Sequence, residues 1–234
     1  MNSKSLPLIY VALDFDTAGE ANQLVEQLDA TSVGLKVGKE LFTAAGPEAV
    51  KRWVKQGFSV FLDLKFHDIP NTVAKAVVQA ARLGVDVVNV HASGGRTMMH
   101  TAKAALEKEG HRPLLIAVTV LTSMSDEDLS EIGIQRNAEE QVLALAKLTQ
   151  AAGLDGVVCS AQEAKMLKSA LGDAFKLMTP GIRPAGSQQD DQKRVMTPEQ
   201  AQQAGVDYMV IGRPITKASN PAQVASEIVA SLAH

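Results

Sequence analysis

The sequence lacks most of the features that mark secreted, membrane-spanning or metal-binding proteins. Its single cysteine, Cys159, excludes an internal disulfide and is typical of a protein from a reducing compartment. No apolar run approaches the ~20 residues that span a membrane, and the N-terminus does not resemble a signal peptide. The five His residues show no helical His-x-x-x-His spacing. We therefore expect a cytoplasmic protein without a membrane-spanning segment.

An excess of one charge is also missing. The chain has 23 Lys and Arg residues against 26 Asp and Glu residues, which gives a net charge of −3. This balance gives no reason to expect binding to nucleic acid or to an anionic membrane, and an anionic ligand would need a local cluster of positive side chains. No Pro/Ser-rich linker interrupts the 234 residues, so the sequence predicts a single domain over 1–234.

Short apolar runs alternate with amphipathic segments along the whole chain. The apolar runs predict strands at 8–13, 33–37, 58–65, 85–90, 114–121, 155–158, 175–178 and 206–211. The amphipathic segments predict helices at 17–28, 40–55, 72–83, 97–107, 138–151, 161–171, 198–204 and 221–232. Strands separated by helices pair in parallel, and eight such units predict an α/β fold, the closed (β/α)8 TIM barrel. An open doubly wound sheet is the rival, but no glycine fingerprint follows the first strand.

The segment 61–72 begins as a buried strand and ends as a charged loop. Asp63 and Lys65 share one face, because successive side chains of a strand point to opposite faces. Asp68 follows where the strand ends, and Pro70 marks the start of a helix. Charges at the end of an apolar strand are costly to desolvate, so they pair with one another or with a ligand. A solvated surface ion pair is the alternative interpretation.

Polar residues stand at or just beyond the ends of most predicted strands. They are Asp14, Lys36, Asp63, Lys65, His91, Thr122 and Arg213. In a barrel these strand ends form one rim, where active sites are built. The polar segment 181–197 predicts a flap, and Gly212 and Arg213 follow the eighth strand, where this fold often binds phosphate. The sequence therefore predicts a site for a phosphate-bearing small molecule.

These motifs resemble a known family. The segment Asp63-Leu64-Lys65-Phe66-His67-Asp68-Ile69-Pro70-Asn71-Thr72 is similar to the signature of the orotidine 5′-phosphate decarboxylases, especially the bacterial ones. Further segments match in order at 11–14, 35–40, 89–95, 120–124, 179–184 and 210–214. The resemblance covers nearly the whole chain. It implies a barrel enzyme of pyrimidine biosynthesis that converts orotidine 5′-phosphate to uridine 5′-phosphate and CO2 without a cofactor or metal.

The resemblance also implies a role for each matching residue. Lys65 is the implied proton donor, and Lys36, Asp63, Lys65 and Asp68 form an alternating charge network. Asp14 and Lys36 hold the ribose, and Thr122 faces the pyrimidine. The residues implied at the phosphate end are Arg183, Gln192, Gly212 and Arg213. Asp68 and Thr72 reach the neighbouring active site, which implies an obligate homodimer.

Three other functions fit parts of the same pattern. A metal-dependent sugar-phosphate decarboxylase of the same suprafamily would use the Asp residues to hold Mg²⁺. An aldolase would form a Schiff base through Lys65. A nucleotide-binding barrel without catalytic activity is the third alternative, and a turnover assay with orotidine 5′-phosphate distinguishes it from the enzyme.

Overall fold

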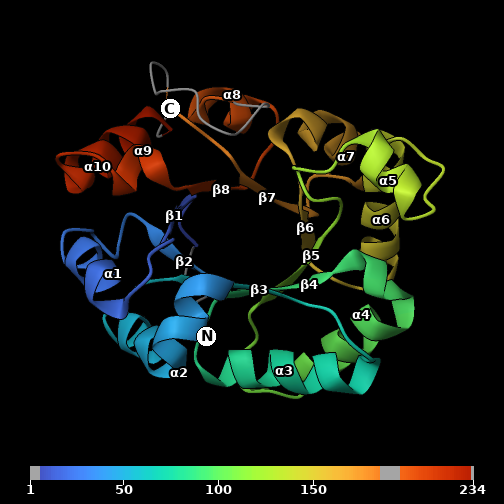
Figure 1. Cartoon of the computed structure of the whole chain (residues 1–234), viewed down its shortest axis with the longest axis horizontal. Helices are drawn as coiled ribbons and strands as arrows, with labels where there is room; N and C mark the ends of the chain where they lie inside the picture. The colour runs from blue at the N-terminus through green and yellow to red at the C-terminus, as the bar shows by residue number, and fades with distance from the viewer. Residues whose placement is uncertain (1–5, 185–195, 233–234) are drawn as a thin grey trace.

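Eight parallel strands close into a barrel that is surrounded by helices (Figure 1). The computed structural model describes residues 6–184 and 196–232. The strands are β1 (Ile9–Ala12), β2 (Gly34–Gly38), β3 (Val60–Phe66), β4 (Val87–His91), β5 (Leu114–Val118), β6 (Gly156–Val158), β7 (Lys176–Pro180) and β8 (Tyr208–Ile211). Each strand pairs with the one before it, and β8 closes the ring against β1. The predicted (β/α)8 barrel is confirmed.

The helices form the outer layer and return the chain between successive strands (Figure 1). They are α1 (Ala18–Val25), α2 (Lys39–Lys55), α3 (Pro70–Arg82), α4 (Gly95–Leu106), α5 (Asp126–Glu131), α6 (Ala138–Ala151), α7 (Ala164–Leu171), α8 (Pro198–Gln203), α9 (Arg213–Thr216) and α10 (Pro221–Ser231), with short 3₁₀ turns at η1 (Ala92–Gly94) and η2 (Ala161–Glu163). In the described ranges, no helix has the length and apolar character needed to cross a bilayer.

The prediction of one continuous helix over 40–55 was wrong. At Gly46 the backbone turns to φ 69° and ψ −176°, so α2 consists of two helical pieces across a kink. Pro47 explains the break, because its ring disfavours a helical conformation at the preceding residue and it has no N–H to donate. Glycine adopts the positive φ without a Cβ clash.

Two short helices were not predicted. Ser125 and Asp128 form a capping box that starts α5, but this helix is acidic and buries only Leu129, so it shows no apolar stripe. The four residues of α9 are too few to give a periodic pattern. The strand predicted over 114–121 ends earlier, at Val118.

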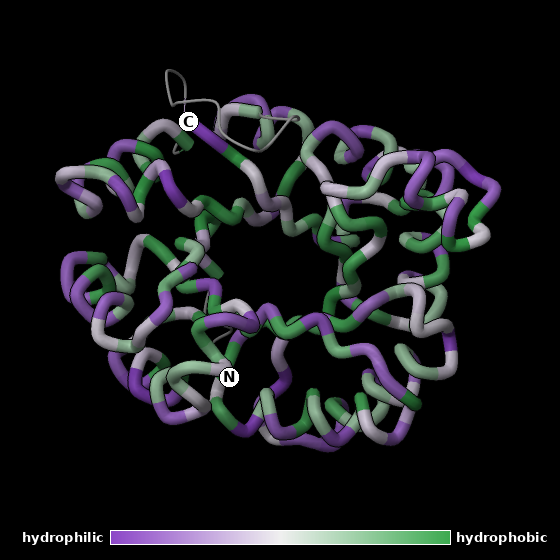
Figure 2. Tube along the Cα trace, viewed as in Figure 1, coloured by the Kyte–Doolittle hydropathy of each residue, from purple (hydrophilic) through white to green (hydrophobic). Residues whose placement is uncertain are grey.

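Alternation along the strands divides the core into two regions. Residues on the outer face, such as Val11 and Leu35, pack under the helices in the larger apolar cluster. Residues on the inner face fill the barrel in a smaller cluster that includes Tyr10, Phe61 and Met178. The hydropathy trace accordingly runs apolar around the ring of strands and more polar along the outer helices (Figure 2). Beneath the carboxyl ends of its strands, the barrel is therefore packed with side chains.

Tyr10 contacts several other residues of the inner cluster or next to it. Its hydroxyl lies 3.0 Å from Ser59 Oγ, and its ring makes edge-to-face contacts with Phe61 and Tyr208. Burial raises the pKa of the Tyr10 hydroxyl above its ordinary value, which keeps it protonated and able to donate. The ring lies directly against Gly34: a Cβ at that position would stand 2.6 Å from two ring carbons.

We expect Gly34→Ala to lower the free energy of unfolding by about 1–3 kcal/mol, because the buried ring of Tyr10 has no room to move away. Urea unfolding followed by circular dichroism measures this. Gly110→Ala is the matched control, since a Cβ there meets nothing within 4 Å. It should change stability by less than about 0.5 kcal/mol. Equal stability of the two variants would contradict the tight packing of Tyr10 on Gly34.

Candidate active site

A cavity of about 320 Å³ opens where the strands end in the barrel rim. Its floor is apolar and includes Ala12, Phe61 and Val210, which are inward-facing residues of β1, β3 and β8. Charged side chains stand above this floor on opposite sides of the cavity. A concave site with an apolar lining and a few convergent polar groups is the usual form of a small-molecule site.

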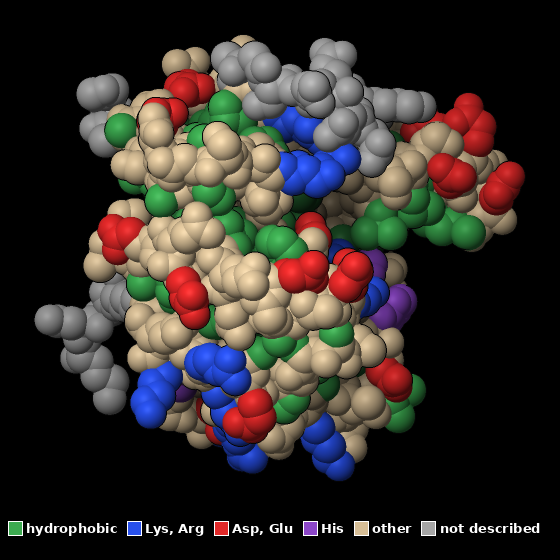
Figure 3. All heavy atoms as spheres, turned by 60° about the vertical axis from the view of Figure 1, so that its left-hand side comes forward, with side chains coloured by type: hydrophobic (Ala, Val, Ile, Leu, Met, Phe, Trp, Pro, Cys, Tyr) green, Lys and Arg blue, Asp and Glu red, His purple; other side chains and the backbone are tan. Residues whose placement is uncertain are grey.

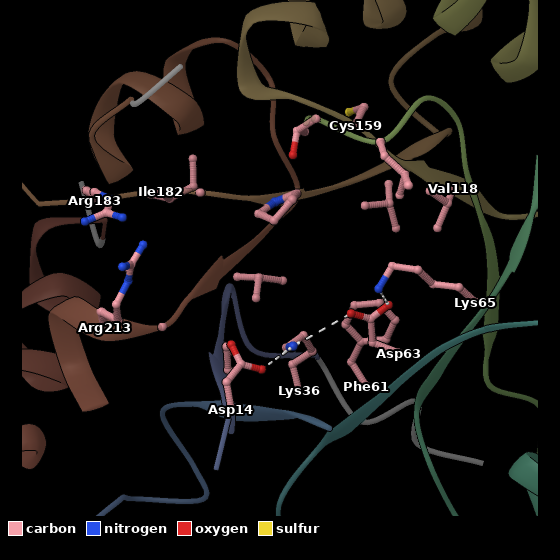
Figure 4. Close-up of a pocket in the computed structure, with 18 of the residues that line it drawn as sticks. Asp14, Lys36, Phe61, Asp63, Lys65, Val118, Cys159, Ile182, Arg183 and Arg213 are labelled. Atoms are coloured by element: carbon pink, nitrogen blue, oxygen red, sulfur yellow. Dashed lines mark hydrogen bonds and ion pairs between the residues drawn. The ribbon is translucent and has the colours of Figure 1, made fainter. Parts of the chain in front are cut away.

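Four charged side chains of alternating sign form a row on one wall (Figure 4). Lys36 Nζ lies 2.9 Å from Asp14 Oδ1 and 3.8 Å from Asp63 Oδ2. Lys65 Nζ lies 2.7 Å from Asp63 Oδ1. Asp63 is only 8% exposed, so its charge depends on these two ammonium groups for compensation. The row Asp14, Lys36, Asp63 and Lys65 therefore exists as a connected network within one chain.

Lys36 and Asp63 reach the cavity from regularly paired positions of β2 and β3, whereas Lys65 reaches it from an irregular part of β3. The pairing of β3 with β4 shifts between Leu62 and Phe66, and Lys65 has a φ of 52°. A positive φ costs a residue with a side chain about 1–3 kcal/mol unless its surroundings enforce it. Such irregularities cluster at functional sites, where a β-bulge redirects a side chain. Here it directs the ammonium of Lys65 toward Asp63.

Asn89 contacts both members of this pair from the neighbouring strand β4. Its Oδ1 accepts a hydrogen bond from the backbone N–H of Lys65 at 2.8 Å, and its Nδ2 donates to Asp63 Oδ1 at 2.7 Å. Asn89 was not among the predicted site residues. The available signal was its position, a single amide inside an apolar strand, because a fully buried polar side chain requires partners.

The opposite side of the cavity is basic. Arg183, which follows β7, and Arg213, which follows β8, extend toward each other across from the charged row (Figure 4). In the space-filling view, basic side chains gather on one side of a hollow and acidic side chains on the other (Figure 3). Arg183 is buried, and Gly212 beside Arg213 also lines the cavity. Two guanidinium groups at one end of a cavity suit an anionic oxygen cluster such as phosphate.

One family accounts for this combination of fold and side chains. The sequence profile described as "Orotidine 5'-phosphate decarboxylase / HUMPS family" matches residues 7–228. The chain belongs to this family. An orotidine 5′-phosphate decarboxylase of Idiomarina loihiensis is 70% identical over 97% of this chain and 99% of its own length. Another, from Shewanella sediminis, is 62% identical over 99% of this chain and 98% of its own length.

Solved structures agree with this assignment. The crystal structure of orotidine 5′-phosphate decarboxylase from Lactobacillus acidophilus matches with a TM-score of 0.88 and 41% sequence identity. The match covers 98% of this chain and all of the other, 100%. The resemblance inferred from the motif at 63–72 is thereby confirmed at the level of the family.

Most of the residues predicted for the site of this decarboxylase family member line one cavity. They are Asp14, Lys36, Asp63, Lys65, Thr122, Arg183, Gly212 and Arg213. Gln192 lies outside the described residues. Thr122 follows β5 and lines the cavity together with Val118 and Leu121, and Val118 lies away from the two arginines (Figure 4). The cavity thus has a basic end, a row of paired charges and a more apolar end.

Asp68 and Thr72 do not line the cavity of their own chain. Both are exposed, and Asp68 Oδ1 accepts a hydrogen bond from the adjacent N–H of Ile69 at 2.6 Å. Ile69 itself is a large apolar side chain that is 67% exposed. The expectation that Asp68 and Thr72 act in a neighbouring subunit stays a prediction.

Two other groups near the rim are held neutral by their surroundings. Burial raises the pKa of the Cys159 thiol, which lines the cavity beside the wall of Val158. Burial also lowers the pKa of His91, and the nearby His67 ring, 5.5 Å away between centroids, lowers it further. We therefore assign the charge of the site to its Asp, Lys and Arg side chains.

The carboxylates of the site are engaged by ammonium groups. Asp14 contacts Lys36, and Asp63 contacts both Lys36 and Lys65. Among residues 6–184 and 196–232, His, Cys, Asp and Glu side chains do not gather in threes or more in a way that could hold a metal ion.

Proposed function

We propose that this protein catalyses the decarboxylation of orotidine 5′-phosphate to uridine 5′-phosphate and CO2, without a cofactor. The observation that supports this most strongly is the row of Asp14, Lys36, Asp63 and Lys65 facing two arginines across one cavity. Membership of the decarboxylase family and relatives of that name at 70% and 62% identity support the same reaction.

The substrate binds with its phosphate at the basic end of the cavity. Arg183 and Arg213 supply forked donors that match phosphate oxygens. Asp14 and Lys36 contact the ribose hydroxyls, and the pyrimidine extends along the wall toward Thr122. This orientation brings C6 of the ring, with its carboxylate, next to the Lys65 ammonium and the Asp63 carboxylate.

The chemical step leaves an electron pair in an unfavourable place. When the bond between C6 and the carboxylate breaks, CO2 departs and the pair remains in the plane of the ring, where the π system delocalises it poorly. A fixed ammonium about 4 Å away stabilises this carbanion by ~4 kcal/mol at an effective dielectric of 20. Lys65 then transfers a proton to C6, which completes uridine 5′-phosphate.

Asp63 contributes in two ways. It holds the Lys65 ammonium in place through a 2.7 Å contact, so the positive charge needs no reorganisation during the reaction. It also lies beside the carboxylate that leaves and repels it in the ground state. We assign the larger effect to the preorganised positive charge, because such electrostatic stabilisation is usually the largest contribution to catalysis.

The phosphate is remote from C6, so its binding energy serves the reaction indirectly. In this proposal the phosphate contacts Arg183, Arg213 and Gln192, and the predicted flap at 181–197, of which 185–195 lie outside the described residues, closes over the substrate and excludes water. Interactions inside the closed site become stronger as water leaves. Binding energy from a non-reacting part of the substrate is thereby used at the reacting carbon.

We further propose that the enzyme acts as a homodimer in which Asp68 and Thr72 complete the site of the partner subunit. The exposed Ile69 between them supports this, because a contact between subunits would bury it. Asp68 would extend the charged row beyond Lys65 and give that ammonium a second carboxylate.

Lys65→Ala should lower kcat roughly 10³-fold or more, because it removes both the ~4 kcal/mol of carbanion stabilisation and the proton donor. Absorbance of the pyrimidine measures turnover, and circular dichroism checks the fold. Lys51→Ala is the matched control: Lys51 pairs with Glu48 on the exposed face of α2, so the rate should not change. Near-normal turnover of Lys65→Ala would remove Lys65 from the mechanism.

Arg213→Ala should lower kcat/KM about 10- to 100-fold, as expected for the loss of a charge-assisted contact to phosphate. The penalty should disappear with orotidine, which lacks the phosphate. Arg82→Ala, which removes an exposed surface pair with Glu109, serves as the control and should leave both substrates unaffected. Equal penalties of Arg213→Ala on the two substrates would contradict a phosphate contact.

Mixed dimers test the shared site. Lys65→Ala and Asp68→Ala should each be nearly inactive alone, but when they are refolded together half of the dimers combine one subunit of each kind. Such a dimer contains one intact site of two, so activity should return to about one quarter of the wild-type value. Recovery of no activity, or a fully active monomer in sedimentation, would refute the shared site.

A further inference from the structure

The amide of Asn89 is the one polar side chain that β4 buries completely beneath the charged row. It is 0% exposed, and its inward-facing neighbour on the same strand is the apolar Val87. Burial of an unpaired amide is unfavourable, and here both ends of the amide have partners on β3. The two partners are the backbone of Lys65 and the side chain of Asp63, which are the two groups nearest the reacting carbon in the proposed function.

The register of β3 and β4 explains why an amide is needed at this position. Leu62 lies opposite Val88 and Phe66 lies opposite Val90, so residues 63–65 of β3 share the single position of Asn89. A bulge of this kind takes backbone groups out of the ladder of hydrogen bonds. The N–H of Lys65 donates instead to Asn89 Oδ1 at 2.8 Å, so the side chain replaces a missing strand partner.

The same amide orients the carboxylate of Asp63. Asp63 Oδ1 accepts from Asn89 Nδ2 at 2.7 Å and from Lys65 Nζ at 2.7 Å, while Oδ2 faces Lys36 at 3.8 Å. The donors and acceptors are assigned by chemistry, since a backbone N–H can only donate and an ionised carboxylate can only accept. The Asn89 amide therefore fixes two things: the backbone conformation of Lys65 and the orientation of the Asp63 carboxylate, which the Lys65 ammonium contacts.

We propose that Asn89 is a positioning residue for the reaction: it holds Lys65 in its left-handed backbone conformation and Asp63 in its orientation, so that the ammonium is fixed before substrate arrives. The chemical role rests on the proposed function. Asn89 is fully buried and is not among the residues that line the cavity, so it acts through Lys65 and Asp63 rather than by touching the substrate.

Substitution by Asp tests this most sharply. Asn89→Asp keeps the oxygen that accepts from Lys65 N–H, but it presents a second oxygen to Asp63. Two buried carboxylates at hydrogen-bond distance share one proton. That proton lets the new Asp side chain donate to Asp63, as Asn89 Nδ2 does in the wild-type protein. We expect kcat of this variant to approach the wild-type value at low pH and to fall at least tenfold as pH rises and the proton is lost. The wild-type enzyme should lack this alkaline decline.

Asn89→Ala should lower kcat about 10- to 100-fold at every pH, with KM changed less than threefold, because substrate contacts remain. Ser59→Ala is the matched control, since it also removes a buried side-chain hydrogen bond inside the barrel, the one to Tyr10 at the far end. It should lower the urea midpoint without changing kcat. If Asn89→Ala does not fold, the near-isosteric Asn89→Asp variant carries the test alone.

Two results would overturn the proposal. One is a kcat within twofold of wild type in both Asn89 variants; the other is a pH profile of Asn89→Asp that is parallel to wild type. A crystal structure of Asn89→Ala tests the geometry independently of any assay. Lys65 should leave its φ of about 52° and lose the contact with Asp63. Failure of the wild-type protein to decarboxylate orotidine 5′-phosphate would instead reject the proposed function and leave this structural result standing.

Discussion

The site depends on compensation of the Asp63 charge inside the rim of an apolar barrel. Its carboxylate is nearly buried, and it is tolerated there because Lys36, Lys65 and Asn89 all approach it. Each of these contacts also fixes the group that makes it. A buried charge that is paired and hydrogen-bonded is thus a means of holding two ammonium groups still. Lys65 has a positive φ, a strained conformation that persists only where the surrounding contacts enforce it.

The barrel was predictable because its pattern is repeated eight times, so errors at single element ends did not change the topology. The kink at Gly46 and the helices α5 and α9 were missed because each depends on local chemistry rather than on periodicity. Rim positions could be predicted as well, since the parallel order brings all carboxyl ends of strands together. That rule located Asp14, Lys36, Asp63 and Arg213 at one cavity.

The position of Lys65 beside Asp63 was predicted, but for an incomplete reason. Plain alternation put it on the face of Asp63, whereas the bulged strand reaches the same result through a positive φ and a shifted register. Asn89 could not be found in this way, because its partners lie 24 and 26 positions away and become its neighbours only when β3 and β4 pair. The role of Asn89 therefore becomes visible only from the contacts between β3 and β4, because the periodicity of either strand alone does not indicate its partners.

The packed interior of the barrel restricts the route by which substrate and products can enter and leave the cavity. Tyr10, Phe61 and Met178 close the space beneath the cavity, so the described part of the barrel is a blind well rather than a channel. Under the proposed reaction, the gas formed at the bottom and the larger nucleotide must leave by the opening through which the substrate came. Under the same proposal, CO2 makes no ionic contact that holds it in the site, whereas the nucleotide leaves only after its phosphate is released from Arg183 and Arg213. Departure of the products is therefore expected to be ordered, with CO2 first.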